Sequence, residues 1–334
     1  MQLSYQQALE MFRQFDRGLT CPGHHPDYII ADALRGSHLA PVFFGFQEGG
    51  NLFYHGFHLS PIGETGFTDI QSAYGYGGPI VSSGNEPFLS RAWSAYDEFC
   101  AKNKVLAEFI RFHPLLNNWL YYRGEVVADR QTVWIDLNGG DLLSTYLVRA
   151  RTAIRKAGKN GVRVEWWDYS RFGEVFPTLY FGVMKELNAR PFYYFSPAYF
   201  NRLLPWPHSH LATALVEDKV IAAAVFLING DIMEYHLSAS TLPGKNLGAG
   251  NLILHEAALR GRKLGCRCLH LGGGTDNNPD NSLLFFKAGF SEQRALFRTG
   301  KHIHLPDQYR HMKDDWLTRT GAYPQRVLFY RQDS

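Results

Sequence analysis

A glycine turn near residue 248 is the stretch of the sequence best suited to hold a phosphate. It reads Lys-Asn-Leu-Gly-Ala-Gly-Asn and leads directly into a helical pattern over residues 250–263. Gly248 and Gly250 let the backbone approach a ligand, and the start of a helix offers unpaired N–H groups and the positive end of the helix dipole. We therefore predict a phosphate or pyrophosphate site, with a plain helix-capping turn as the alternative. Its residues are Lys245, Gly248, Ala249, Gly250 and Asn251.

Candidate acid–base residues lie on both sides of this turn. Glu234 and His236 share one face of a predicted strand, because side chains alternate along a strand. A histidine or carboxylate with a near-neutral pKa can deprotonate an attacking amine, and His236 has the more suitable reference pKa. Asp276 follows the next predicted strand, at a place where ligands collect in α/β sheets. A polar sheet face and a simple turn residue are the alternative interpretations.

The elements that position these residues repeat along the chain. The second half predicts three strands, the glycine turn, a helix and a further strand, at residues 211–217, 220–228, 232–238, 250–263 and 267–271. The first half predicts a hairpin, a glycine-rich loop, a helix and a strand, at residues 39–47, 52–59, 74–79, 85–102 and 105–112. This similarity of order indicates an internal duplication.

Four segments carry a family resemblance. Lys-x-x-Gly-x-Gly before a helix, followed by a strand and Phe285–Phe290, resembles the acyl-CoA site of the GNAT acyltransferase superfamily. Tyr74–Pro79 and Glu108–Pro114 resemble signatures of its FemAB-like branch, which includes FemX-like peptidoglycan-bridge enzymes and CelD-type acetyltransferase domains. The resemblance implies mixed α/β architecture with two tandem GNAT-like domains. Their expected extents are 1–140 plus a C-terminal strand over about 318–334, and 141–317.

The resemblance also implies roles for single residues. Lys287 matches a lysine that tRNA-dependent FemAB members place near the donor phosphates. Phe285 stands where many GNAT enzymes carry a tyrosine that protonates the leaving thiolate, and phenylalanine has no proton to donate. That leaves the usual acid role unfilled. The residues expected to bind the acceptor are Tyr74, Tyr76, Arg111, His113, Arg190 and Tyr194.

The function implied by these features is acyl transfer by direct attack. The expected donor is acyl-CoA, and the expected acceptor is an amine of a sugar, nucleotide-sugar or peptide precursor. The first alternative is a FemX-like aminoacyltransferase that uses aminoacyl-tRNA to extend a peptidoglycan precursor. The second is a non-catalytic protein that binds a glycan precursor.

The composition sets further limits. A net charge of +3 over 334 residues is too small to indicate a general nucleic-acid-binding surface, so any RNA contact must be local. The N-terminus lacks the features of a signal peptide, and no apolar run approaches the length of a membrane span. Cys266 and Cys268 have no second pair to complete a zinc set, so we expect reduced cysteines, no metal and a cytoplasmic protein.

Overall fold

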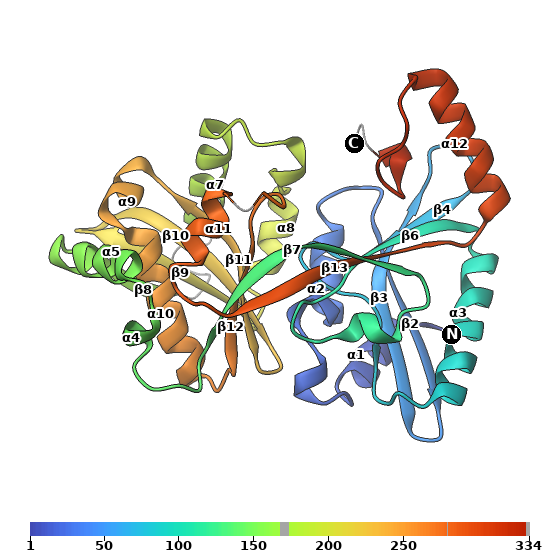
Figure 1. Cartoon of the computed structure of the whole chain (residues 1–334), viewed down its shortest axis with the longest axis horizontal. Coiled ribbons are helices and arrows are strands. Elements are labelled where there is room, and N and C mark those ends of the chain that lie inside the picture. The colour runs from blue at the N-terminus through green and yellow to red at the C-terminus, as the bar shows by residue number, and fades with distance from the viewer. Residues whose placement is uncertain (168–173, 279, 332–334) are drawn as a thin grey trace. The chain divides into compact units, whose positions relative to one another are not determined.

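The computed structural model describes residues 1–167, 174–278 and 280–331, which form two compact units (Figure 1). Unit 1 contains Met1–Asp129 and Phe297–Ser334, and unit 2 contains Arg130–Leu296. Each unit combines helices with a β-sheet, which confirms the predicted fold class. The sequence analysis placed the domain boundaries at 140 and 317, whereas the chain passes between the units within two strands, β7 and β13.

Unit 1 is built on a sheet in the order β1-β2-β3-β4-β6-β13, with β5 paired to β3. The predicted hairpin is present as β2 and β3, and the predicted helix as α3, which Asn85 caps through the Phe88 N–H. The strands are β1 (Gln2–Leu3), β2 (Ala40–Glu48), β3 (Asn51–Pro61), β4 (Thr68–Gln71), β5 (Ile80–Val81), β6 (Val105–Arg111) and parts of β7 (Glu125–Asp136) and β13 (Arg294–Ile303). The helices are α1 (Tyr5–Phe12), α2 (Pro26–Ala33), α3 (Glu86–Lys102) and α12 (Pro306–Thr320), with short turns η1 (Arg17–Leu19), η2 (Pro22–His24), η3 (Asn118–Tyr121) and η5 (Phe329–Arg331).

Unit 2 is built on a sheet in the order β7-β12-β11-β10-β9-β8. Helix α10 packs against β9, β10 and β12 and against α5, and buries Ile253 and Leu254 in the main core of this unit (Figure 1). The strands are β8 (Arg163–Trp167), β9 (Ser209–Val216), β10 (Lys219–Asn229), β11 (Ile232–Ser240) and β12 (Cys268–Gly273). The helices are α4 (Leu142–Thr145), α5 (Val148–Lys159), α7 (Val175–Glu186), α8 (Pro197–Leu203), α9 (Leu242–Leu247), α10 (Ala249–Lys263) and α11 (Ser282–Lys287), with the turn η4 (Pro191–Tyr193).

The C-terminal segment differs from the prediction. A C-terminal strand was expected over about residues 318–334, but α12 extends to Thr320 and the described part of this segment ends in the turn η5. Leu328 and Phe329 are buried against Tyr309 and Trp316 of α12, so the apolar pattern reflects packing of the tail and not strand pairing. The expected return of this segment to the first domain is present, since it belongs to unit 1. The sequence also has a helical pattern over residues 169–189; its first part lies outside the described residues, and its described part contains α7.

Membrane crossing is not indicated by the helices that the structure describes. None of them combines the length and the apolar composition that a bilayer span requires.

A buried carboxylate ties the sheet of unit 1 to α3. Glu108 on β6 accepts hydrogen bonds from the hydroxyl groups of Tyr96 (2.8 Å) and Tyr122 (2.6 Å), and lies 3.3 Å from Nε2 of His304. Burial alone would raise the pKa of Glu108, but the hydrogen bond and charge of His304, the charge of His55 and the Tyr122 hydroxyl together lower this pKa to about 2. Glu108 is therefore ionised in the folded protein at neutral pH.

We expect Glu108→Ala to destabilise the protein by about 3 kcal/mol at pH 7, because two buried hydroxyl groups and His304 lose their partner. The carboxylate has a lower pKa in the folded protein than in the unfolded chain, so its stabilisation is complete at neutral pH. It declines as the pH falls below the ordinary glutamate pKa toward 2. Urea unfolding of the wild type and the variant between pH 7 and pH 3 measures this difference. Glu98→Ala on the exposed side of α3 is the control, and an equal loss in both variants would contradict the assignment.

Candidate functional site

The two central strands of unit 2 separate in the middle of the sheet. Strands β11 and β12 are parallel and pair only over Ile232↔Cys268, Met233↔Leu269 and Glu234↔His270, although both strands continue beyond these residues. On its other edge, β11 contains a bulge at His236, because Val225 and Phe226 of β10 pair with Leu237 and Tyr235. A bulge takes its residue out of regular pairing. On the β12 side, backbone groups of β11 beyond Glu234 are not paired with β12 and border a gap between the strands, where backbone N–H groups can polarise a carbonyl.

The predicted phosphate turn is a junction of two helices. Helix α9 ends and α10 begins at Gly248, whose φ of +77° is left-handed. A Cβ at Gly248 would lie 2.7 Å from the carbonyl oxygen of Ala153 on α5, so this position requires glycine. Gly250 is different, because a Cβ there would meet only the ring of Phe286 at 3.8 Å. At the start of α10, position 248 therefore requires glycine, whereas position 250 leaves space for a ligand.

The remaining predicted phosphate residues surround this junction. Lys245 is exposed near the end of α9, Ala249 is buried and Asn251 is half-buried. The first hydrogen bonds of α10 run from the N–H groups of Asn251 and Leu252 to the carbonyl of Gly248. This arrangement is compatible with an anion at the start of α10, with Lys245 close along the chain.

Lys287 lies where β11 and β12 separate. Its ammonium donates a 2.7 Å hydrogen bond to the carbonyl of Gly273 at the end of β12 and lies 5.8 Å from the ring centre of Tyr235 on β11. The residue is buried, and burial lowers the pKa of Lys287 to about 7. An amine with this pKa exchanges protons readily at neutral pH.

The two predicted catalytic residues of β11 have different surroundings. Glu234 is buried, whereas His236 is half-buried and forms a 2.6 Å hydrogen bond between its Nε2 and the hydroxyl of Tyr199. Tyr199 belongs to α8 and stacks on Phe195, with ring centres 4.8 Å apart. The phenol therefore fixes the orientation of the imidazole.

Asp276 is held by its own loop. Its carboxylate accepts hydrogen bonds from the Asn278 N–H and the Asn281 side chain, both at 3.0 Å. These bonds lower the pKa of Asp276, and the residue is exposed. This environment suits a carboxylate that orders the loop after β12 better than one that accepts a proton.

Phe285 has no acid function and faces outward. Its ring is 60% exposed, and the guanidinium of Arg149 lies 4.0 Å from the ring centre. Arg149 also donates to the Phe285 carbonyl at 2.8 Å. The position that carries a tyrosine in many GNAT enzymes is thus an aromatic surface backed by a cation.

In unit 1, Tyr74 and Tyr76 belong to a loop that is bonded into the sheet. Gly77 donates to the carbonyl of Arg111 at 2.7 Å and pairs with Phe112 as a parallel bridge. Tyr74 donates its N–H to Asp32 at 2.9 Å, while the ring of Tyr76 packs edge-on against His113 with centres 5.2 Å apart. The loop therefore continues the parallel pairing of β4 and β6. In unit 2, the corresponding parallel strands β11 and β12 separate instead.

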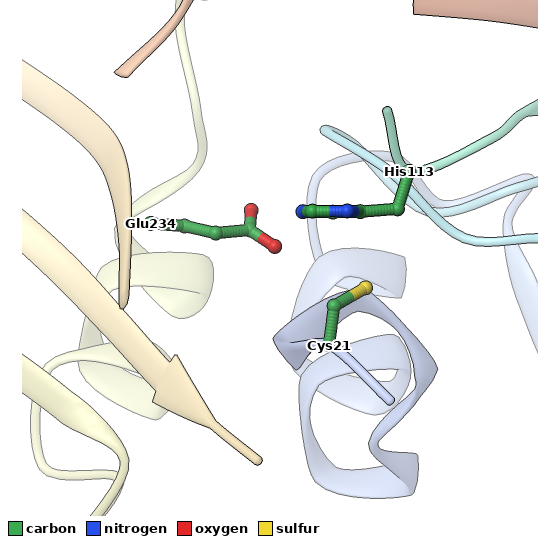
Figure 2. A group of neighbouring side chains, drawn as sticks. All are labelled: Cys21, His113 and Glu234. Carbon is green, nitrogen blue, oxygen red and sulfur yellow. The ribbon is translucent and has the colours of Figure 1, made fainter. Parts of the chain in front are cut away.

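His113 has a buried thiol as a neighbour. The Cys21 sulfur points toward the ring of His113 and lies within 4.8 Å of a ring nitrogen (Figure 2). Cys21 also has its N–H bonded to Nδ1 of His24 at 3.1 Å. One thiol and one imidazole are two of the four ligands of a structural zinc site, so this pair alone does not define a metal site.

The other predicted acceptor residues are spread over both units. Arg111 is half-buried at the end of β6 in unit 1. Arg190 and Tyr194 flank η4 in unit 2, where both are exposed, and the ring of Tyr194 stacks on Phe181 with centres 6.5 Å apart. The structure gives each residue a place, and their binding of an acceptor remains a prediction.

Three features of the site were not found from the sequence. Tyr199 gives no local signal, because its partner His236 is 37 positions away. The bulge at His236 depends on the register of β10 and has no marker such as glycine. The buried state of Lys287 was also not predicted, since a lysine at the end of a short helix reads as exposed.

Comparisons with known proteins agree with this geometry. Residues 147–279 match the family described as Acetyltransferase (GNAT) domain. No curated protein matches the chain. Among solved structures, FemX has 13% identity and a TM-score of 0.71, covering 93% of this chain and 99% of that one.

Two further structures are lysylphosphatidylglycerol synthetases or related proteins by name. The C-terminal domain of a putative lysylphosphatidylglycerol synthetase from Agrobacterium fabrum is 14% identical, with a TM-score of 0.61 and coverage of 94% of this chain and 97% of that one. L-PGS from Bacillus licheniformis is 12% identical, with a TM-score of 0.59 and coverage of 90% and 92%. At these identities, the similarity establishes the fold.

We expect Gly250→Val to leave the free energy of unfolding within about 1 kcal/mol of the wild type, because a side chain at this position meets little. The same variant should weaken donor binding about tenfold or more, because the branched side chain blocks the start of α10. Calorimetry with coenzyme A and with charged tRNA measures the second effect.

Gly248→Ala is the matched variant. It should destabilise unit 2 by about 1–3 kcal/mol, because a side chain there is strained and meets the Ala153 carbonyl. Unchanged donor affinity in a stable Gly250→Val protein would show that the donor binds elsewhere.

Proposed function

We propose that the chain is a FemAB-like GNAT acyltransferase, supported by the GNAT match at residues 147–279 and the FemX-like fold, and that unit 2 transfers an aminoacyl group from an activated ester to an amine or hydroxyl of a cell-wall or lipid precursor. The observation that carries this proposal is the position of Lys287. Its ammonium contacts Gly273 of β12 and lies beside Tyr235 of β11, where the two strands separate. A reacting carbonyl in that gap meets a proton donor and the bulged backbone of β11 together.

Each step of the transfer has a candidate group in unit 2. His236, oriented by Tyr199, removes a proton from the attacking amine, and Glu234 lies two residues away on the same strand. The amine nitrogen bonds to the carbonyl carbon, and backbone N–H groups at the bulge stabilise the negative charge that develops on the oxygen. The bond to the leaving oxygen then breaks, and the Lys287 ammonium supplies the proton that this oxygen takes up.

The nature of the acid favours an ester donor. A thiol is moderately acidic, so a thiolate can leave without assistance, whereas a ribose hydroxyl is a much weaker acid and needs a proton as it leaves. Lys287, with its pKa near 7, supplies such a proton, and Phe285 supplies none. Aminoacyl-tRNA ends in an ester of a ribose hydroxyl. The names of the lysylphosphatidylglycerol synthetases, with their similar fold, support an aminoacyl donor as well.

Acyl-CoA is the second candidate donor. The Gly248–Gly250 junction at the start of α10 favours it, because open space at a helix N-terminus suits a pyrophosphate. Coenzyme A carries a pyrophosphate, whereas the acceptor end of tRNA carries single phosphodiesters. The reaction would then be N-acylation with a thiolate leaving group.

Transfer assays with each donor distinguish these candidates. The full chain is supplied with radiolabelled aminoacyl-tRNA or acetyl-CoA, each with UDP-linked muropeptide or phosphatidylglycerol vesicles as acceptor. Transfer from aminoacyl-tRNA is the expected result. Transfer only from acetyl-CoA would replace the proposal with the second candidate. Binding of an acceptor with no transfer from either donor would return the chain to the alternative of a non-catalytic binding protein.

We expect the rate of transfer to fall as the pH rises above about 7. Burial lowers the pKa of Lys287 to about 7, so its ammonium loses the acidic proton in this range. Lys287→Arg should remove this decline, since arginine stays protonated, while reducing the rate at pH 7 by about 100-fold for lack of a transferable proton. Single-turnover pH profiles provide the measurement. Lys263→Arg, at an exposed position on α10, is the control. A decline that persists unchanged in Lys287→Arg would assign the titration to another group.

A further inference from the structure

Asn281 begins helix α11 with its side-chain oxygen. The oxygen accepts hydrogen bonds from the N–H groups of Leu283 (3.0 Å) and Leu284 (3.2 Å), which is the usual role of asparagine at a helix N-cap. The helix has six residues, and the first four N–H groups of any helix have no partner within it. The direction of α11 therefore depends strongly on the residue that caps it.

The nitrogen of the same side chain binds the loop that leads from β12 to α11. It donates to the hydroxyl of Thr275 at 2.7 Å and to the carboxylate of Asp276 at 3.0 Å. The backbone of Gly274 lies directly against this side chain, because a Cβ at Gly274 would be 2.6 Å from the Asn281 amide. One half-buried side chain thus joins the start of the loop to the start of the helix.

The far end of α11 returns to the strand from which the loop leaves. Lys287 is the last residue of this helix, and its buried ammonium donates to the carbonyl of Gly273 at 2.7 Å. The next carbonyl, of Gly274, accepts a 3.2 Å hydrogen bond from Arg130 of β7, so β7 anchors the same strand end. The strand end, the loop, Asn281 and α11 form a closed ring, and Lys287 makes the closing contact.

We propose that Asn281 is the positioning residue for Lys287: its amide nitrogen fixes the loop, its oxygen starts α11, and together they place the ammonium where β11 and β12 separate. This inference rests on the proposed function, in which Lys287 is the proton donor. A displacement of about 1 Å can reduce a rate by about 100-fold, so a residue that directs a short helix can control the transfer through Lys287 alone.

Asp276 makes the role of the Asn281 amide testable. The hydrogen bonds from Asn278 and Asn281 hold the pKa of Asp276 below its usual value, so this carboxylate is ionised at neutral pH. An aspartate at position 281 would still accept the two N–H groups of α11, but it would have no amide to donate and would face a second carboxylate. Asn281→Asp therefore keeps the helix cap and breaks the contact with the loop.

Trace labelling of lysines with acetic anhydride, from about pH 5 to about pH 10, follows the titration of Lys287 without turnover, because an amine reacts in its neutral form. Burial lowers the pKa of Lys287 to about 7. We expect the pH of half-maximal labelling to rise by at least about one unit in Asn281→Asp, because a displaced ammonium gains water and approaches the ordinary lysine pKa. Mass spectrometry locates the label, and the exposed Lys263 of α10 is the internal reference.

Tyr235 of β11 does not confuse this titration, although its ring centre lies 5.8 Å from the Lys287 ammonium. Burial raises the pKa of Tyr235 above its ordinary value, so the phenol stays neutral while Lys287 titrates. A change in the labelling midpoint therefore reports the surroundings of the amine.

Two further variants test the contact itself. Asn85→Asp is the matched control, because Asn85 caps α3 in unit 1 through the N–H of Phe88, and it should leave the labelling midpoint of Lys287 unchanged. The double variant Asp276→Asn with Asn281→Asp exchanges carboxylate and amide. It removes the repulsion and returns a donor to the contact, so we expect the midpoint to move back toward the wild-type value.

An unchanged midpoint in Asn281→Asp would overturn the proposal. A midpoint that stays equally displaced in the double variant would overturn it too, because the change would then not come from the contact between Asn281 and Asp276. If Asn281→Asp does not fold, Asp276→Ala takes its place. It removes the loop partner and leaves the cap, and an unchanged midpoint there has the same meaning.

Transfer assays separate this inference from the proposed function. We expect kcat to fall about 100-fold in Asn281→Asp with the KM for the acceptor within about twofold, because Asn281 acts through Lys287 and not on the substrate. A displaced labelling midpoint with an unchanged transfer rate would overturn Lys287 as the acid and leave the role of Asn281 in placing its ammonium intact. The labelling result also stands if no donor supports transfer.

Discussion

The parallel pairing of β11 and β12 ends after three residue pairs, and the chemistry assigned to unit 2 depends on that interruption. Parallel strands that stayed paired would bond their backbone groups to each other and leave no place for a substrate carbonyl. The interruption exposes polar backbone that has to be accommodated. Lys287 satisfies one of these backbone groups by donating a hydrogen bond to the carbonyl of Gly273, and its amine is buried in doing so. The same burial brings its pKa to the range in which it can act as an acid, so one contact serves both structure and reaction.

The corresponding place in unit 1 is closed. Strands β4 and β6 pair from Thr68↔Val105 to Gln71↔Phe109, and the loop at Gly77 extends the pairing to Phe112. The Asn118 side chain fastens this loop by donating to the carbonyls of Gly77 and Pro79. The duplicated topology therefore has one copy with a gap between its central strands and one copy with the gap filled. The filled sheet of unit 1 offers no such gap between its parallel strands, which is why the proposed transfer is assigned to unit 2.

Local signals in the sequence predicted the parts of the fold that local physics determines. The glycines at 248 and 250 marked a turn before a helix, and Asn85 with Pro87 marked the start of α3, because these residue types act on the backbone beside them. The tail at 326–330 was mistaken for a strand, because apolar residues packed on α12 give the same pattern as a buried strand. The Tyr199–His236 bond arises between distant segments, and no short window of sequence contains it.

Each unit has a cation near the end of the second strand of a parallel pair: Lys287 of α11 donates to Gly273 at the end of β12, and Arg111 is the last residue of β6. At β12 the cation is a lysine, which can lose its proton, so burial changes its pKa and makes it reactive. At β6 it is Arg111, which stays charged even with its pKa lowered to about 10, so burial cannot be relieved by deprotonation near neutral pH. The charge of Asp32 opposes the effect of burial on Arg111. A buried lysine beside a strand end can therefore take part in proton transfer near neutral pH, whereas a buried arginine keeps its charge there.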